Sequence, residues 1–300
     1  MKWQMTVALL LLAGAAMAQD TSPTKCDSCA AWNVPQAPFR IYGNTYYVGT
    51  RELSAILIAA PDGLVLIDAA LPESAPQIAG NIRALGFDPR NIKLILNSHA
   101  HFDHAGSIAW LQKQSGAKVA ASPWSAATLA RGVTDKADPQ FGMGIATPPV
   151  ANIQTLRDGE VLRVGTVALT AHFTPGHTPG GTSWSWKSCE QARCLNLVYI
   201  DSLTAVSGDS YFYTAHPKLL QGFRKSFATL ESLPCDILLT PHPGFSNLLG
   251  KLKARDTDKQ ADAFVNPQAC RNFAAAARGE FHKRITREEA ALKARPTSAH

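Results

Sequence analysis

Short runs of alternating or β-branched apolar residues recur along the first half of the chain and predict the strands of one sheet. The runs are Phe39–Val48, Ser54–Ala59, Leu64–Ile67 and Ile92–Leu96. Turn signals separate them, among them Gly43-Asn44 and Pro61-Asp62-Gly63. Apolar residues at helical spacing follow over Pro72–Leu85 and Asp103–Gln114, and a glycine stands soon after each stretch. The pattern therefore predicts strands followed by helices.

The same order returns in the second half of the chain. Strand-like runs cover Ile153–Leu156, Val161–Val164, Val167–Phe173, Thr182–Trp186, Leu195–Ile200 and Asp236–Thr240. Helical spacing covers Lys218–Glu231 and Pro267–Arg278. This predicts the α/β class, with two halves at about residues 19–150 and 151–300 packed sheet to sheet and helices outside. Between them, residues 132–151 are rich in Gly, Pro, Asp and Thr, which is typical of a lid or binding loop.

Composition and charge narrow the functional classes. The chain has 300 residues, of which 46% are hydrophobic and 17% charged, against roughly 25% charged in average soluble domains. No linker divides it, so one globular domain is expected. The formal net charge is +6, but no run of consecutive basic residues marks a nucleic-acid track. A nucleic-acid partner is therefore not expected.

The amino-terminal residues have the pattern of a secretory signal peptide. Lys2 precedes an apolar stretch from Val7 to Ala16, and Ala16-Met17-Ala18 resembles a cleavage site. The apolar stretch is shorter than the ~20 residues that a membrane span needs. Residues 1–18 are thus predicted to be removed on export, leaving a periplasmic domain over residues 19–300 with no membrane span.

The six cysteines are expected to form disulfides, because export brings them into an oxidising compartment. Cys189 and Cys194 flank a short loop between two strand-like runs, so a bond between them would staple a hairpin. Cys235 and Cys270 would close a long loop. A structural zinc on Cys26 and Cys29 with another pair is the alternative, although a second C-x-x-C is missing.

Metal-capable side chains gather at the ends of three predicted strands. The strand Ile92–Leu96 leads into His99-Ala100-His101-Phe102-Asp103-His104. Residues two apart in an extended chain project to the same side, so His99 and His101 can reach one ion. Asp103 and His104 open the next helix and can face a second ion. His177 and His242 follow the strands Val167–Phe173 and Asp236–Thr240, and α/β proteins place their sites at such strand ends.

This order of ligands resembles the metallo-β-lactamase superfamily, and three further segments resemble its subclass B3. The segments are Pro38–Gly49, Pro175–Trp184 and Tyr199–Ala205. The resemblance implies a four-layer αβ/βα sandwich and two Zn²⁺ ions per chain. It assigns zinc 1 to His99, His101 and His177, and zinc 2 to Asp103, His104 and His242. It also matches Cys189–Cys194 and Cys235–Cys270 to known disulfide pairs. Cys26 and Cys29 are left to pair with each other or to stay free.

The resemblance further implies a secreted β-lactamase that confers antibiotic resistance. A zinc-bound hydroxide, oriented by Asp103, would attack the lactam amide of penicillins, cephalosporins and carbapenems. Ser202 and Thr204 would bind the substrate carboxylate, and Phe141 and Ile145 would line the cleft. The only partner expected is this small-molecule substrate, and the chain is predicted to be a monomer.

Two alternatives remain at this point. The first is another hydrolase of the same fold, such as a glyoxalase II-like thioesterase, in which an aspartate bridges the metals; Asp201 beside Ser202 could play that part. The second is a periplasmic zinc-binding protein without catalysis. Three-histidine sites with an open position are poor storage sites, which argues against it.

Overall fold

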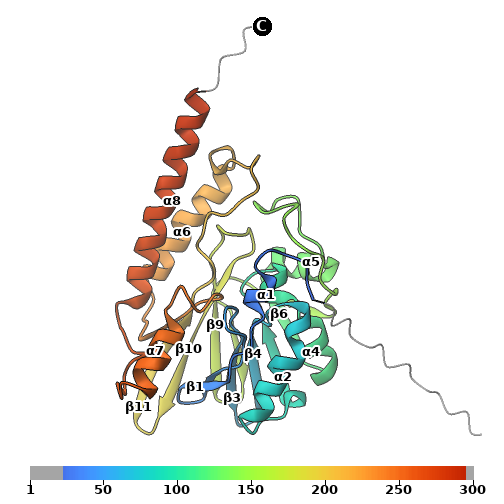
Figure 1. The fold of residues 1–300 in the computed structure, drawn as a ribbon, viewed down its shortest axis with the longest axis vertical. Helices are drawn as coiled ribbons and strands as arrows, with labels where there is room; N and C mark the ends of the chain where they lie inside the picture. The colour runs from blue at the N-terminus through green and yellow to red at the C-terminus, as the bar shows by residue number, and fades with distance from the viewer. Residues whose placement is uncertain (1–22, 295–300) are drawn as a thin grey trace, which may run out of the picture.

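Two β-sheets lie face to face in the computed structural model, with helices on both outer sides (Figure 1). The structure describes residues 23–294, so the predicted leader of residues 1–18 lies outside the described residues. The four layers agree with the predicted α/β sandwich. Among residues 23–294, no helix has the length and apolar character needed to cross a membrane.

The first sheet orders its strands β1 to β7 as they follow in the sequence. They are β1 (Phe39–Tyr42), β2 (Thr45–Tyr47), β3 (Ile56–Ala60), β4 (Gly63–Ile67), β5 (Ile92–Leu96), β6 (Lys118–Ala121) and β7 (Ile153–Thr155). Strands β1 to β4 are antiparallel, whereas β4 to β7 are parallel. The run Phe39–Val48 is therefore a hairpin, and Gly43 in its turn has a φ of 53°, which glycine adopts without strain.

The second sheet has the order β12-β11-β10-β9-β8. Its strands are β8 (Val161–Val164), β9 (Val167–Phe173), β10 (Thr182–Glu190), β11 (Arg193–Tyr199) and β12 (Ile237–Leu239). Strand β7 pairs with β6 of the first sheet, so the sequence prediction that placed Ile153–Leu156 in the second half is wrong. A parallel partner of this kind depends on contacts that the local pattern does not encode.

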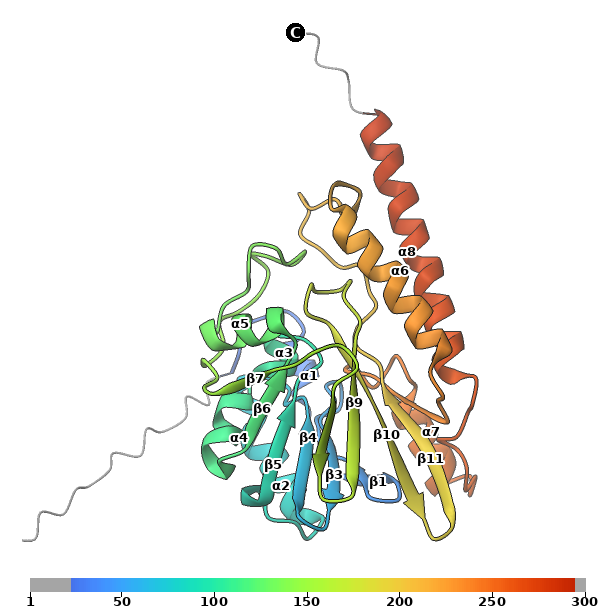
Figure 2. The ribbon, with the colours of Figure 1, turned by 180° about the vertical axis from the view of Figure 1, so that it is seen from behind.

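Alternate residues of a central strand such as β4 face different cores, as the period of two requires. In β4, Val65 and Ile67 pack between the two sheets, whereas Leu64 and Leu66 face the helices of the first sheet. That outer layer consists of α2 (Ala75–Ala84), α4 (Ile108–Ser115) and α5 (Pro123–Arg131). The outer layer of the second sheet consists of α6 (Pro217–Ser232) and α8 (Ala269–Ala294), which lie side by side in both views (Figure 2).

Several helices differ from their predicted extents. The helix predicted over Asp103–Gln114 is broken into α3 (Phe102–Ala105) and α4. At the break, Gly106 donates its N–H to the carbonyl of Ala70. A Cβ on Gly106 would lie 2.3 Å from the backbone nitrogen of Pro72, so only glycine fits there. Helix α8 continues past Arg278 to Ala294, and α1 (Cys29–Trp32), α5 and α7 (Leu248–Asp256) have no counterpart in the prediction.

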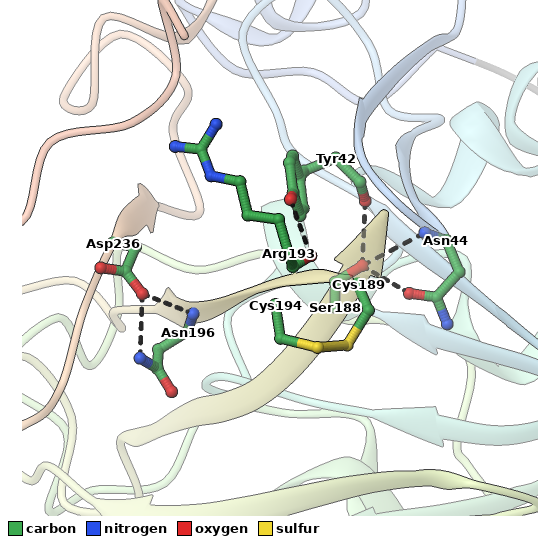
Figure 3. The surroundings of a disulfide bond; sticks show 8 residues. All are labelled: Tyr42, Asn44, Ser188, Cys189, Arg193, Cys194, Asn196 and Asp236. Carbon is green, nitrogen blue, oxygen red and sulfur yellow. Dashed lines mark hydrogen bonds between the residues drawn. A yellow bond between two sulfur atoms is a disulfide. The ribbon is translucent and has the colours of Figure 1, made fainter. Parts of the chain in front are cut away.

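Three disulfides join cysteines in the described part of the chain: Cys26–Cys29, Cys189–Cys194 and Cys235–Cys270. The second connects opposite residues of the β10–β11 hairpin (Figure 3). Beside it, Ser188 Oγ donates to the carbonyl of Tyr42 at 3.0 Å and accepts from the Asn44 N–H at 3.1 Å. These bonds fasten the β1–β2 turn of the first sheet to the second sheet, at a hairpin end away from the predicted metal ligands.

Candidate metal centre

The six predicted metal ligands meet above the carboxyl ends of the strands, because each follows a strand that ends at this edge of the sandwich. His99 and His101 lie after β5, and Asp103 and His104 lie in α3. His177 follows β9 and His242 follows β12. The structure brings them together as two groups, His99-His101-His177 and Asp103-His104-His242. Within each group the possible ligand atoms lie within 4.8 Å of one another.

The three-histidine group is buried and each ring has a partner on one nitrogen. His99 Nδ1 lies 2.7 Å from Asp201 Oδ1, and His101 Nε2 lies 3.0 Å from Asp138 Oδ2. His177 Nδ1 lies 2.8 Å from the carbonyl oxygen of Thr204. Such contacts fix the ring orientation and leave the other nitrogen for a metal. On His177 that nitrogen, Nε2, lies 3.2 Å from Gln140 Nε2, a contact that a bound metal would displace.

Burial also keeps two of these imidazoles, His99 and His177, in the neutral form that a metal requires. Loss of hydration first, and then the neighbouring imidazoles, hold the pKa of His99 well below its ordinary value. Burial, with His101 nearby, lowers the pKa of His177 to about 3. Neither ring therefore carries a proton at neutral pH that a metal would have to displace.

The second group is more open and contains a carboxylate. Asp103 Oδ2 lies 3.2 Å from His104 Nε2 and 3.4 Å from His242 Nε2. Burial alone would raise the pKa of Asp103, but the charge and hydrogen bonds of His104 and His242 hold it well below the usual range. Burial alone would lower the pKa of His104, but Asp103 beside it raises this pKa above the ordinary value.

The residues of both groups fit zinc. Within residues 23–294, His99 Nε2 is a buried polar atom without a hydrogen-bond partner, and such an atom is costly unless something else satisfies it. A metal ion among the three imidazoles would do so. Imidazole nitrogen with one carboxylate oxygen is a donor set that zinc commonly takes.

A cavity of about 440 Å³ opens over the two groups. Ser202 and Thr204, the residues predicted to contact the substrate, line it together with Gln140. The apolar part of its lining comprises Trp32, Phe102, Met143, Val206 and Phe245. The predicted lining residues Phe141 and Ile145 are not among the described residues that line it. The 132–151 loop instead presents Gln140, Met143 and Gly144, and Phe141 is 50% exposed.

Sequence reasoning missed two buried carboxylates that support the site. Asp138, in the 132–151 loop, is the partner of His101. Asp68, directly after β4, accepts hydrogen bonds from the Ser98 N–H at 2.8 Å and the Tyr199 hydroxyl at 2.8 Å. Asp68 stands at a strand end like the histidines, so the same rule could have found it. No such signal precedes Asp138.

Asp201, the residue that kept the thioesterase alternative open, lies behind the three-histidine group. Its side chain is fully buried, contacts His99, and belongs to neither candidate metal group of the described residues. Burial raises its pKa well above the ordinary aspartate value. This position suits a residue that orients His99 from behind.

Comparison with known proteins gives matches over much of the chain. A family profile described as the metallo-beta-lactamase superfamily matches residues 48–190. Among curated proteins, a ribonuclease of Thermus thermophilus is 30% identical over 132 residues, 42% of this chain and 30% of that protein. A hydroxyacylglutathione hydrolase of Cereibacter sphaeroides is 27% identical over 173 residues, 56% of this chain and 53% of that protein. The chain thus spans about half or less of these two relatives.

Solved structures match over greater lengths. The Rm3 metallo-beta-lactamase is 52% identical with a TM-score of 0.86, covering 89% of this chain and 100% of that one. MEM-A1, a subclass B3 metallo-beta-lactamase from a soil metagenome library, is 47% identical with a TM-score of 0.83, over 87% and 99% of the chains. BJP-1, a subclass B3 metallo-beta-lactamase of Bradyrhizobium japonicum, is 31% identical with a TM-score of 0.81, over 88% and 99%.

Proposed function

The chain belongs to subclass B3 of the metallo-β-lactamases, and on that premise we propose that it hydrolyses the amide bond of β-lactams with two zinc ions. The observation that carries the proposal is the pairing of a buried three-histidine group with Asp103, His104 and His242 under one cavity. The proposed substrates are penicillins, cephalosporins and carbapenems. Hydrolysis of these drugs would confer resistance.

The residues divide the work in a way that their contacts support. His99, His101 and His177 would hold one ion, and Asp103, His104 and His242 the other. When bound, the ions supply a water-derived nucleophile at neutral pH and polarise the lactam carbonyl. Asp103, ionised at neutral pH, has a second carboxylate oxygen with which to orient the attacking water. The water oxygen bonds to the carbonyl carbon, the C–N bond breaks, and the ring nitrogen gains a proton.

The cavity wall offers groups for the rest of a β-lactam. Ser202 is 5% exposed and lines the cavity, so its hydroxyl can donate a hydrogen bond to the substrate carboxylate. Thr204 lines the same wall, although its Oγ1 also lies 3.1 Å from His177 Nδ1. Trp32, Met143 and Phe245 offer apolar surface to the substituents of the lactam.

We further propose that the protein acts in the periplasm as a monomer. The signal-like pattern of residues 1–18 supports export. The disulfides support an oxidising compartment, because such bonds are rare in the reducing cytosol. The small-molecule substrate requires no second subunit at the cavity.

A direct comparison of substrates tests the proposal. Purified protein is incubated with a cephalosporin, a carbapenem and a glutathione thioester, each with and without a metal chelator. Lactam hydrolysis that the chelator abolishes is expected, and an inhibitor that acylates serine enzymes should have no effect, because no serine nucleophile takes part. Faster turnover of the thioester would favour the alternative hydrolase, and zinc binding without any turnover would favour a binding protein.

A further inference from the structure

The wall of the cavity that carries Thr204 has no regular secondary structure of its own. After β11, residues 201–212 form neither helix nor strand, and a short 3-10 turn, Tyr213–Ala215, precedes α6. This segment nevertheless contributes Ser202, Thr204 and Val206 to the cavity. Its position must therefore come from contacts with other elements.

Arg284, on helix α8, binds three points of this segment. Its Nη2 donates to Ser207 Oγ at 2.8 Å and to the Tyr211 carbonyl at 3.1 Å. Nη1 donates to the Ala205 carbonyl at 3.3 Å. The guanidinium also lies 5.4 Å from the centre of the Tyr213 ring. One side chain thus gathers acceptors that are six residues apart in the sequence.

Glu288, one helical turn further along α8, binds both Arg284 and the end of the segment at Thr214. Oε1 accepts from Arg284 Nε at 2.6 Å, and Oε2 accepts from the Thr214 N–H at 2.9 Å and from Thr214 Oγ1 at 3.2 Å. The residue is 4% exposed. Burial alone would raise its pKa, but the hydrogen bonds from Thr214 and Arg284 outweigh burial and lower it. Glu288 is therefore an ionised carboxylate at neutral pH.

The same segment contacts the three-histidine group directly at His177 and indirectly through the loop that carries Asp138. The Thr204 carbonyl is the partner of His177 Nδ1. The Gly208 N–H donates to the Pro139 carbonyl at 2.9 Å, and Pro139 follows Asp138, the partner of His101. A shift of the segment would therefore change the support of two imidazoles of one group.

We propose that Arg284 and Glu288 are positioning residues. They hold residues 203–214, which are most of this segment and the start of the 3-10 turn, against α8, and thereby orient His177 and the loop that carries Asp138. The inference rests on the proposed function for its catalytic consequence, but not for its effect on metal binding. The alternative is that the pair only stabilises the packing of α8.

Arg278 provides the matched control, because it lies on the same helix and also forms an ion pair and a contact with an aromatic ring. It forms an ion pair with Glu231 of α6, and its guanidinium lies 5.8 Å from the centre of the Phe227 ring. These contacts join α8 to α6 without involving residues 203–214. Arg278→Met thus removes a comparable packing contact and spares the segment.

The experiment compares wild type, Arg284→Met and Arg278→Met. Amide hydrogen exchange is measured on the chelated proteins, and zinc affinity by competition with a chromophoric chelator. Faster exchange over residues 203–214 and about 2- to 30-fold weaker zinc binding are expected in Arg284→Met alone, a range typical of residues that act through a contact network. Arg284→Lys should be intermediate, because lysine keeps the charge beside Glu288 but cannot reach all three acceptors.

Equal exchange and equal zinc affinity in Arg284→Met and Arg278→Met would overturn the inference. If Arg284→Met does not fold, Arg284→Lys and Glu288→Gln answer the same question by the same two measurements. The lactam assay separates the two proposals. If the wild type does not turn over lactams, the proposed function is wrong, but the exchange and zinc results still test the inference. If Arg284→Met keeps the kcat, KM and zinc affinity of an active wild type, the inference alone is wrong.

Discussion

The two groups of metal-capable side chains differ in how firmly the protein holds them. In the three-histidine group, Asp201, Asp138 and the Thr204 carbonyl each fix one ring. In the second group, His242 Nδ1 lies 3.2 Å from the Glu52 carbonyl, a longer contact than those of the first group, and its side chain is 23% exposed. His104 Nδ1 is buried without a hydrogen-bond partner among residues 23–294.

The difference indicates that the side chains of the first group are already fixed in place before metal binds, whereas those of the second group become fixed only when metal binds. Supported ligands lose less freedom on binding, and their supporting contacts are commonly worth 10- to 100-fold in metal affinity. Charge adds to the contrast, because the first group contains only imidazoles and the second pairs His104 with a carboxylate. We therefore expect unequal zinc affinities.

Deletion of one ligand from each group should have the largest effect. His99→Ala is expected to lose the tighter ion and to lower kcat/KM by more than roughly a thousandfold, since attack by water then lacks metal activation. His242→Ala should lose only the weaker ion. Elemental analysis after dialysis measures both. His172→Ala is the control, because His172 contacts Ser185 in the second sheet; two tightly held ions in His242→Ala would show that His242 is not a ligand.

A cavity residue outside both groups should affect turnover without affecting metal. Ser202→Ala is expected to keep two zinc ions and to lose a charge-assisted hydrogen bond to the substrate, worth about 1.5 to 3 kcal/mol. At about 1.36 kcal/mol per decade, this is roughly a 10- to 150-fold loss in kcat/KM. Steady-state kinetics beside zinc analysis tests it, and zinc loss in Ser202→Ala would mean that the serine belongs to the metal site.

Removal of one support should weaken the first group selectively. Asp201→Asn leaves His99 in place but removes the carboxylate behind it, so zinc affinity of the three-histidine group should fall about 10- to 100-fold. Both ions should still bind at high zinc concentration. Asp236→Asn is the matched control, since Asp236 accepts from the Asn196 N–H at 2.7 Å near the hairpin (Figure 3). Complete loss of one ion even at high zinc concentration would instead support a bridging Asp201.

Lower pH should weaken zinc binding by the second group more than by the first, because protons compete with zinc for His104. The raised pKa of His104 means that a proton must leave this ring before a metal binds, whereas the lowered pKa values of His99 and His177 mean that no proton competes there. As pH falls towards 6, affinity of the second group should fall by up to about tenfold per pH unit for one displaced proton. Zinc competition assays across this range measure it; an equal fall in both groups would remove the electrostatic part of the contrast.

The six candidate ligands could be predicted from the sequence because their signals are local. His99 to His104 fall within one short segment, and His177 and His242 stand in Pro- and Gly-rich turns directly after strands. The strand periodicity in turn predicted the two facing sheets, since alternate residues of β4 enter different cores. These features need no knowledge of distant contacts.

The remaining features depend on tertiary contacts. The helix predicted over Pro267–Arg278 stops short of Arg284 and Glu288, whose contacts with residues 203–214 lie on the continuation of α8. The 132–151 loop has no regular spacing of apolar residues that would indicate which positions face inward. Phe141 and Ile145 were therefore predicted to line the cavity, whereas Gln140 and Met143 do so. Asp138 could not be found for the same reason.

A zinc titration of the chelated wild-type protein, followed by calorimetry at neutral pH, tests the central claim most directly when β-lactam turnover is measured in the same samples. Two successive binding events are predicted. The tighter event should disappear in His99→Ala and the weaker one in His242→Ala, and turnover should appear only with bound zinc. A single class of equal sites, loss of the tighter event in His242→Ala, or lactam turnover by the zinc-free protein would contradict the account.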